Sequence, residues 1–227
     1  MTRVALAVFD VGGTSIRDTA DVPAVFASAL SQHGIATTPA LLRQWRGASK
    51  KEVIARLIEE SALQSLDPER VYRTFQDLLV AALGERGVEA VPGIEDAFDR
   101  LRSSGCKVCL ATGFDTRIMG VVMDALRWSQ VVDGVVTADD VSRGRPAPDL
   151  IHTAMLKANV ERAASVVAVG DTTNDLESAR AAGVGASIGV LTGAHDRERL
   201  SAAPHTVILE SAADIPSWLS ERQWLIG

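Results

Sequence analysis

"VFDVGGTSIRD", residues 8–18, is the stretch that decides the fold of this chain. An apolar run at 4–9, VALAVF, ends at Asp10, and a valine, two glycines and a threonine follow. Consecutive apolar side chains are typical of a strand that is buried on both faces in a parallel sheet. Glycines after such a strand permit a tight turn whose N–H groups face an anion. The stretch therefore predicts a central strand that presents a carboxylate at its carboxyl end.

Similar apolar runs recur along the chain and alternate with helical patterns. The runs that predict strands are KVCLAT at 107–112, SVVAVG at 165–170 and GASIGVL at 185–191, with GVVTA at 134–138 and HTVILE at 205–210 as further candidates. Helical spacing separates them, as in the apolar set Ile94, Ala97, Phe98 and Leu101. The alternation predicts an α/β fold with a parallel sheet and right-handed crossovers.

One long segment interrupts this alternation. Residues 18–91 carry several helical patterns in succession and no convincing strand. Thr38 before Pro39, and Asp67 before Pro68, each pair a capping side chain with a proline suited to the first helical position. We therefore expect a core domain of residues 1–17 and 92–227 and an all-helical insert of residues 18–91.

Composition excludes several classes of partner. The 227 residues are 47% hydrophobic and carry 29 acidic against 23 basic side chains, a net charge of −6 without long runs of like charge. Such a balance disfavours nucleic acid. The first apolar run ends in an aspartate without a cleavage site, and no run reaches the length of a membrane span. We expect a cytoplasmic protein that binds no membrane, with Cys106 and Cys109 as reduced core residues on opposite faces of a strand.

Polar residues follow the predicted strands in four places. They are the loop 10–14, Thr112 in TGFDTR, Arg145 in RGRPAP, and Asp171 with Asp175 in GDTTND. The carboxyl ends of strands in an open parallel sheet converge on one crevice, which is the usual ligand site. We therefore expect these residues to meet in one pocket.

The stretch at 8–18 alone fits two kinds of protein. DxGGT resembles the first phosphate loop of actin-fold sugar kinases, and an aspartate before a Gly-Thr turn also suits an enzyme that forms an aspartyl-phosphate. The kinases continue into a second and a third antiparallel strand. Here the helical segment TADVPAVFASALSQHG, residues 19–34, follows instead. The kinase interpretation is therefore disfavoured.

In their order, the four segments resemble the motifs of the haloacid dehalogenase superfamily, which has a Rossmann-like core and a cap inserted after the first motif. The chain is most similar to the phosphonatase-like hydrolases, a branch that includes the phosphonoacetaldehyde hydrolases. The similarity lies in FDVGGTSI (9–16), RGASKKEVIARLI (46–58), ATGFDTR (111–117), GRPAPDLI (144–151), VGDTTNDLESARAAGV (169–184) and the tail at 189–219. It implies a magnesium-dependent hydrolase of small phosphonates or phosphorylated metabolites, present as a monomer or a homodimer.

The resemblance and the chemistry of the side chains together suggest roles. Asp10 would attack phosphorus as a nucleophile, while Thr112 and Arg145 would act on the phosphoryl group. Backbone groups of the two motif loops would hold the same phosphoryl group, at Gly12, Gly13, Thr14 and Gly113. Hard oxygen ligands suit Mg²⁺, and the expected set is Asp10, the carbonyl of Gly12, Asp171 and Asp175.

Gly12 is unusual for this superfamily. Its phosphatases and phosphomutases have a second aspartate there, which protonates the leaving oxygen and later activates water. Such general acid–base catalysis raises the reaction rate by about two to four orders of magnitude. Dehalogenases also lack that acid, but they have no use for magnesium, whereas both Asp171 and Asp175 are kept here. In phosphonoacetaldehyde hydrolases a cap lysine condenses with the aldehyde and accepts the electrons of the C–P bond. The matching residue is Lys50.

Lys50 also has a plain structural interpretation. Ser49 and Glu52 form an S-x-x-E capping box, so Lys50 and Lys51 could be solvated residues of a first helical turn. The helix dipole opposes cations at that place and lowers the pKa of an amine, which favours a substrate lysine.

The chain also departs from the hydrolase pattern at two positions of the cap. Val53 replaces a histidine and Arg46 replaces a methionine, so Arg46 or Lys50 could instead grip a carboxylate or phosphate. Two alternatives therefore stay open: a phosphatase or phosphomutase with another acid–base group, and a non-catalytic phosphate-ligand binder.

Overall fold

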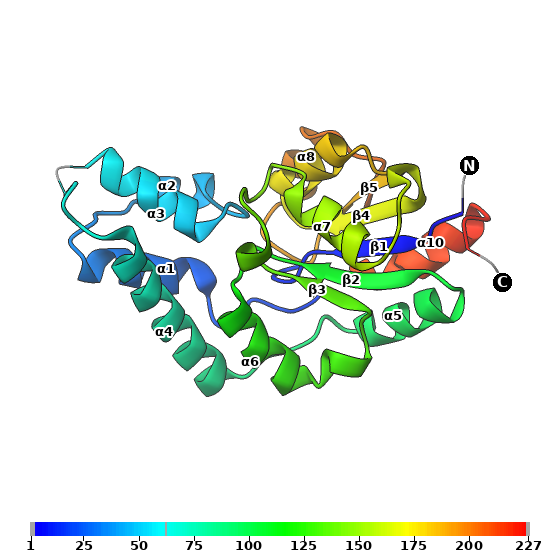
Figure 1. Ribbon diagram of the computed structural model, residues 1–227, viewed down its shortest axis with the longest axis horizontal. Coiled ribbons are helices and arrows are strands. Elements are labelled where there is room, and N and C mark those ends of the chain that lie inside the picture. Colours follow the sequence, from blue (N-terminus) through cyan, green and yellow to red (C-terminus); the bar gives the residue numbers. More distant parts are fainter. Residues whose placement is uncertain (1–2, 62, 226–227) are drawn as a thin grey trace.

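The computed structural model describes residues 3–61 and 63–225, in which six strands form one parallel sheet (Figure 1). Its strand order is β3-β2-β1-β4-β5-β6. The strands are β1 (Leu6–Phe9), β2 (Lys107–Ala111), β3 (Gly134–Val136), β4 (Val166–Gly170), β5 (Ala186–Val190) and β6 (Val207–Leu209). Each lies within a run that predicted it, and the α/β fold is confirmed.

Helices cover both faces of this sheet (Figure 1). One face packs against α5 (Ile94–Ser103), α6 (Thr116–Leu126) and α10 (Ile215–Glu221), and the other against α7 (Asp149–Lys157) and α8 (Thr173–Ala182), while α9 (Arg197–Ser201) lies beside β6. Successive residues of a strand point to opposite faces. Phe9 accordingly packs edge-on against Phe98 of α5 at 5.0 Å, while its neighbour Val8 belongs to the other core. Cys106 and Cys109 are free, buried and divided between the same two cores.

The insert consists of helices (Figure 1). In its described residues these are α1 (Val22–Gln32), α2 (Pro39–Gln44), α3 (Lys50–Glu59) and α4 (Pro68–Arg86). The predicted helix starts are confirmed, because the Thr38 side chain accepts from the Leu41 N–H and the Asp67 side chain from the Glu69 N–H. The ring of Phe26 in α1 packs edge-on against that of Phe75 in α4, with 5.5 Å between the ring centres, and both belong to the same apolar cluster as Phe9 of the sheet.

The two chain segments that connect the insert to the core run side by side. Ile16 and Ala90 form an antiparallel bridge, the Arg17 N–H donates to the Glu89 carbonyl at 2.8 Å, and the Val91 N–H donates to the Ser15 carbonyl at 2.9 Å. Entry and exit at one place are what a hinged lid requires. We propose that residues 18–91 form a cap domain on a core of residues 1–17 and 92–227.

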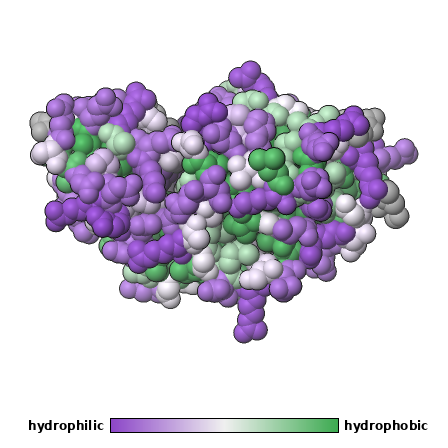
Figure 2. Space-filling view, viewed as in Figure 1, coloured by the Kyte–Doolittle hydropathy of each residue, from purple (hydrophilic) through white to green (hydrophobic). Residues whose placement is uncertain are grey.

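The visible face of the molecule is mainly hydrophilic (Figure 2). Among residues 3–61 and 63–225, no helix combines the length and the apolar character needed to cross a bilayer.

Candidate active site

The register of the sheet brings the predicted residues together at its carboxyl edge. Phe9 is paired with Leu110 of β2 on one side and with Val169 of β4 on the other. Asp10, which directly follows β1, is therefore level with the last residues of both neighbouring strands. Thr112 and Asp171 follow those strands, and all three side chains lie in residues at most 7% exposed.

Arg145 joins the carboxylates of two segments. Its Nη1 lies 2.7 Å from Asp10 Oδ1 and its Nε lies 2.8 Å from Asp175 Oδ1, while Nη2 donates to the Ala111 carbonyl at 2.7 Å. The side chain of Arg145 is only 9% exposed. A buried guanidinium with three such partners is rigid, and it offers a fixed positive charge beside Asp10.

The loop after β4 and the first turn of α8 hold the other two carboxylates. Asp175 closes a capping box at the start of α8, where its Oδ2 accepts from the Thr172 N–H at 3.0 Å and from the Thr172 hydroxyl at 2.5 Å. Asp171 Oδ2 accepts from the Ala194 N–H at 2.6 Å, and Asp171 Oδ1 accepts from the Thr14 hydroxyl at 3.3 Å. Both side chains are held in place by the core.

Asp10, Asp171 and Asp175 form a cluster with the chemistry of a metal site. One ligand oxygen from each lies within 4.8 Å of the others, and all three residues are buried. Burial raises the pKa of Asp10 to about 7 against the opposing effect of Arg145, and burial also raises the pKa of Asp171 well above its usual range. Three buried carboxylates need more positive charge than Arg145 supplies, and a small cation with hard-oxygen preference, such as Mg²⁺, fits them.

The loop after β1 differs in part from expectation. Gly13 has a φ of +81°, and its N–H donates to the Ile16 carbonyl at 2.7 Å. The prediction that this N–H binds a phosphoryl group is therefore wrong. The turn closes on itself because the chain must bend back toward the Ile16–Ala90 bridge. Gly13 is required for close approach, because an added Cβ would lie 2.6 Å from Asp171 Oδ2. Thr14 is fully buried, and its hydroxyl donates to Asp171. It does not line the cavity between sheet and insert, so the prediction that Thr14 contacts a phosphoryl group is wrong.

Gly12 lies in a less restrictive environment than Gly13. Its φ lies outside the left-handed region, and a Cβ there would meet only the Phe114 ring, at 3.7 Å. The backbone therefore does not require glycine at residue 12.

Thr112 accepts the Phe114 N–H on its Oγ1 at 3.1 Å, which leaves the hydroxyl hydrogen available to a group in the cavity.

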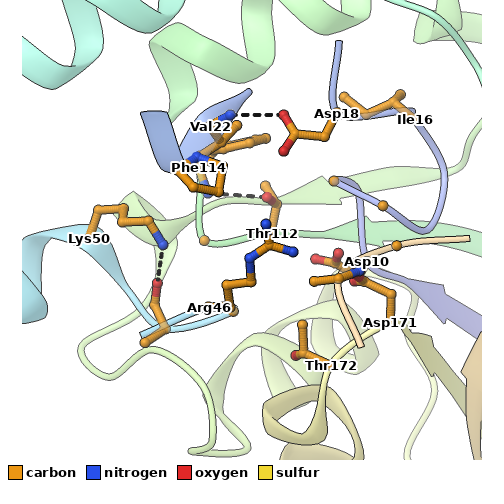
Figure 3. Close-up of a pocket in the computed structure, with 18 of the residues that line it drawn as sticks. Asp10, Ile16, Asp18, Val22, Arg46, Lys50, Thr112, Phe114, Asp171 and Thr172 are labelled. Carbon is orange, nitrogen blue, oxygen red and sulfur yellow. Dashed lines mark hydrogen bonds between the residues drawn. The ribbon is translucent and has the colours of Figure 1, made fainter. Parts of the chain in front are cut away.

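A cavity of about 250 Å³ lies between this edge of the sheet and the insert (Figure 3). Its floor contains the predicted residues Asp10, Gly12, Gly13, Thr112, Gly113, Arg145, Asp171 and Asp175. Its roof comes from the insert and includes Val22, Phe26, Leu42, Trp45, Arg46, Lys50, Leu79 and Leu83. The floor is charged, and the roof is mostly apolar but also carries the cations Arg46 and Lys50 and the carboxylate of Asp18.

Lys50 is one of the two roof cations. Its Nζ donates to the carbonyls of Ala48 at 3.2 Å and Trp45 at 3.5 Å, and it lies 5.4 Å from the centre of the Phe26 ring (Figure 3). Burial lowers the pKa of Lys50 to about 8, and the nearby Arg46 acts in the same direction. Lys50 is half-buried, lines the cavity and donates to two backbone carbonyls, which disfavours the interpretation of Lys50 as a solvated surface lysine.

Arg46 is the second roof cation, and its side chain extends from the insert toward Asp10 and Thr112 (Figure 3). Its carbonyl accepts from Asn174 Nδ2 at 3.0 Å, which ties this part of the insert to the first turn of α8, beside Asp175. Val53, at the position of the expected histidine, is 1% exposed and packs in the insert.

Further contacts hold the insert against the core. Asp115 Oδ2 accepts from the Tyr72 hydroxyl at 2.5 Å and from Gln76 Nε2 at 2.8 Å, and its Oδ1 caps α6. The Gly144 N–H donates to Glu52 Oε1 at 2.7 Å. The insert is therefore docked over the cavity.

Three residues of the site, in the loop after β5, were not among the predicted site residues, although the sequence LTGAHD places His195 after a predicted strand and near the rim of the site. The loop after β5 supplies Thr192, Gly193 and Ala194 to the cavity, and Gly193 passes so close to Asp171 that a Cβ would overlap its carboxylate. The buried His195 accepts the Thr173 N–H on Nδ1 at 3.1 Å and so supports the start of α8. The run of small residues after a predicted strand, TGA, was the available signal.

Comparison with known proteins agrees with this geometry. A family model described as haloacid dehalogenase-like hydrolase matches residues 4–183. The chain belongs to this family. Membership of this family excludes the alternative that the stretch at 8–18 is the phosphate loop of an actin-fold sugar kinase.

Proteins with the name phosphonoacetaldehyde hydrolase are similar to this haloacid dehalogenase-like hydrolase along most of its length. The protein from Nitratidesulfovibrio vulgaris is 28% identical over 207 residues, covering 85% of this chain and 73% of that protein. The protein from Bordetella avium is 27% identical, with 96% of this chain and 91% of that protein covered. The crystal structure of a phosphonoacetaldehyde hydrolase-like protein from Oleispira antarctica superimposes with a TM-score of 0.82 at 25% identity, over 99% of this chain and 96% of that one.

Proposed function

We propose that this hydrolase cleaves the C–P bond of a small aldehyde-bearing phosphonate, through an aspartyl-phosphate on Asp10 and an imine on Lys50. The observation that carries the proposal is the poorly solvated Lys50 amine in the roof of the same cavity whose floor holds Asp10, with glycine at residue 12. The relatives named phosphonoacetaldehyde hydrolase support this class of substrate.

The floor would bind and attack the phosphonyl group. Thr112 would donate its free hydroxyl hydrogen to one phosphonyl oxygen, and Arg145 would neutralise negative charge beside Asp10. Mg²⁺ would be held by Asp10, the Gly12 carbonyl and Asp171, with Asp175 in support, and when bound it offsets the repulsion between an anionic nucleophile and an anionic substrate. Asp10 would then approach phosphorus in line with the C–P bond.

The roof would supply the electron sink. The neutral Lys50 amine adds to the aldehyde carbon, the resulting carbinolamine takes up one proton from solvent, and water leaves to give a protonated imine. As an Asp10 oxygen bonds to phosphorus, the C–P bond breaks and its electron pair forms the C=C bond of an enamine. The enamine takes a proton on carbon, and water then releases the aldehyde and the Lys50 amine. A second water hydrolyses the aspartyl-phosphate to phosphate and Asp10.

This route explains why residue 12 can be glycine. An ester substrate needs a proton on the leaving oxygen, whereas the imine accepts the electrons of the C–P bond without an acid at that place. The apolar roof around Phe26 keeps the amine partly neutral, because a low-polarity surrounding disfavours the ammonium form.

A substrate panel tests the proposal. Phosphate release is measured with Mg²⁺ present from phosphonoacetaldehyde and from a set of phosphate monoesters. The proposal expects phosphonoacetaldehyde to be preferred by about a hundredfold or more in kcat/KM. Preference for an ester would assign a phosphatase or phosphomutase instead, and tight phosphate binding without any turnover would assign a non-catalytic binder.

A further inference from the structure

Glu52 is the acidic member of the expected capping box of α3, but only half of that box is formed. The Ser49 side chain accepts from the Glu52 N–H at 3.5 Å. In the part of the chain that the structure describes, the Glu52 carboxylate does not complete the box in return. It accepts the N–H of Gly144 across the boundary between insert and core, at 2.7 Å.

The approach of the two segments at this point is unusually close. A Cβ added to Gly144 would lie 2.7 Å from Ser49 Cβ and 3.3 Å from Glu52 Oε1. Gly144 is not in the left-handed region, so its backbone does not need glycine. The absence of a side chain at residue 144 serves the contact with the first turn of α3.

Gly144 directly precedes Arg145, whose guanidinium bridges Asp10 and Asp175. From this juxtaposition we propose that Glu52 is a positioning residue, which holds the Gly144 N–H and thereby sets Arg145 against Asp10 when the cap is docked. The proposal rests on the function proposed above, in that Arg145 is taken to act on the phosphoryl group. Docking of the cap would then complete the charge arrangement around the nucleophile as well as exclude water.

The chain offers a matched control beside Glu52. Lys51 Nζ lies 3.5 Å from Asp139 Oδ1 across the same boundary, with both side chains about 40% exposed. An exposed pair at that distance contributes little, and its core partner is Asp139 rather than Gly144. Loss of Lys51 removes a cap-to-core contact without removing the proposed support of Arg145.

The test measures the affinity for inorganic phosphate by titration calorimetry with Mg²⁺ present, together with kcat and KM for phosphonoacetaldehyde. E52A is expected to weaken phosphate binding about tenfold and to lower kcat, because a hydrogen bond to a charged group is lost. E52Q keeps an acceptor oxygen and is expected to recover most of the loss. G144A should resemble E52A, while K51A should stay near the wild type.

A double-mutant cycle separates positioning of Arg145 from a general loosening of the cap. In an R145A background, E52A should cost almost nothing further in phosphate affinity. Equal losses for E52A and K51A, failure of E52Q to recover binding, or full additivity with R145A would each overturn the proposal. If the wild type turns over no phosphonate at all, the proposed function fails, and the phosphate-binding series still tests the role of Glu52.

Discussion

The floor and the roof of the cavity are built in different ways. On the floor, Asp10, Asp171 and Asp175 sit among fixed partners, and the cation Arg145 is paired on each side. On the roof, Lys50 donates to the backbone carbonyls of Trp45 and Ala48 and faces the Phe26 ring. Charge is concentrated and paired on the floor, whereas the roof places a few charged side chains among mostly apolar ones.

This difference separates two chemical tasks. A floor of paired charges is already organised for an anion and keeps its geometry during phosphoryl transfer. A lysine without a carboxylate partner loses its proton easily and becomes a nucleophile toward an aldehyde. Under the proposed function, the core would supply the phosphoryl chemistry and the insert would decide which carbon group is accepted. Variants of floor and roof should therefore fail in different ways.

The largest effect is expected at the centre of the floor. D10N removes the proposed nucleophile and should lower phosphate release from every substrate about a thousandfold or more. The measurement is the steady-state release of phosphate. D18N is the control, because Asp18 lines the same cavity but caps the Val22 N–H at 2.9 Å outside the carboxylate cluster. Comparable losses in D10N and D18N would argue against a distinct role for Asp10.

A roof variant should be selective. K50A is expected to lower turnover of phosphonoacetaldehyde about a hundredfold or more, the order seen when a positioned catalytic group is lost. The affinity for inorganic phosphate should change far less, since the floor is intact. Calorimetry and steady-state rates check the two expectations, with K51A as the neighbouring control. A parallel collapse of phosphate binding would mean that Lys50 serves the phosphoryl group itself.

G12D should shift the balance between floor and roof. A Cβ at residue 12 meets only the edge of the Phe114 ring at 3.7 Å, so the variant is expected to fold. The new carboxyl can protonate a leaving oxygen, and hydrolysis of p-nitrophenyl phosphate should rise by about tenfold to a hundredfold. The measurement compares this ester with phosphonoacetaldehyde. No gain, in a variant that unfolds at the wild-type temperature, would show that the missing acid is not what limits ester cleavage.

The smallest expected effect is a pH dependence that comes from the roof. With its pKa lowered to about 8 by burial, the Lys50 amine is neutral above that pH, so turnover should fall about tenfold per pH unit below it and level off above. Because only the unfolded chain still binds this proton between pH 8 and about 10.5, the same shift should also raise the free energy of unfolding across that range. Rate profiles and denaturant titrations measure both. A flat profile between pH 6 and 8 would contradict a reacting amine.

Much of the floor could be predicted from the sequence, because parallel pairing leaves few choices. Once the apolar run before Asp10 was read as a central strand, the residues after the neighbouring strands had to lie at the same edge. Thr112 and Asp171 therefore lie beside Asp10 at the carboxyl edge of the sheet, as expected. The fold class, the strands and the helix starts at Thr38 and Asp67 follow from the same local rules.

The details that failed depend on tertiary contacts. The Gly13 N–H closes its own turn on Ile16, which the glycine pair alone does not reveal. Glu52 fits a local capping box by spacing, but its carboxylate bonds Gly144 because the docked core offers a closer donor. Ala194 reaches Asp171 from a loop whose small residues carry no chemical signature. Contacts between segments that are distant in sequence leave no periodic pattern.

The central claim is that the cap amine and the core carboxylate act on one substrate, and covalent trapping tests it most directly. The enzyme is treated with borohydride in the presence of phosphonoacetaldehyde, and the site of reduction is located by peptide mass spectrometry. The account predicts a reduced adduct on Lys50, formed also in D10N because the imine precedes attack on phosphorus. An unmodified Lys50 in an enzyme that still releases phosphate from phosphonoacetaldehyde would contradict it.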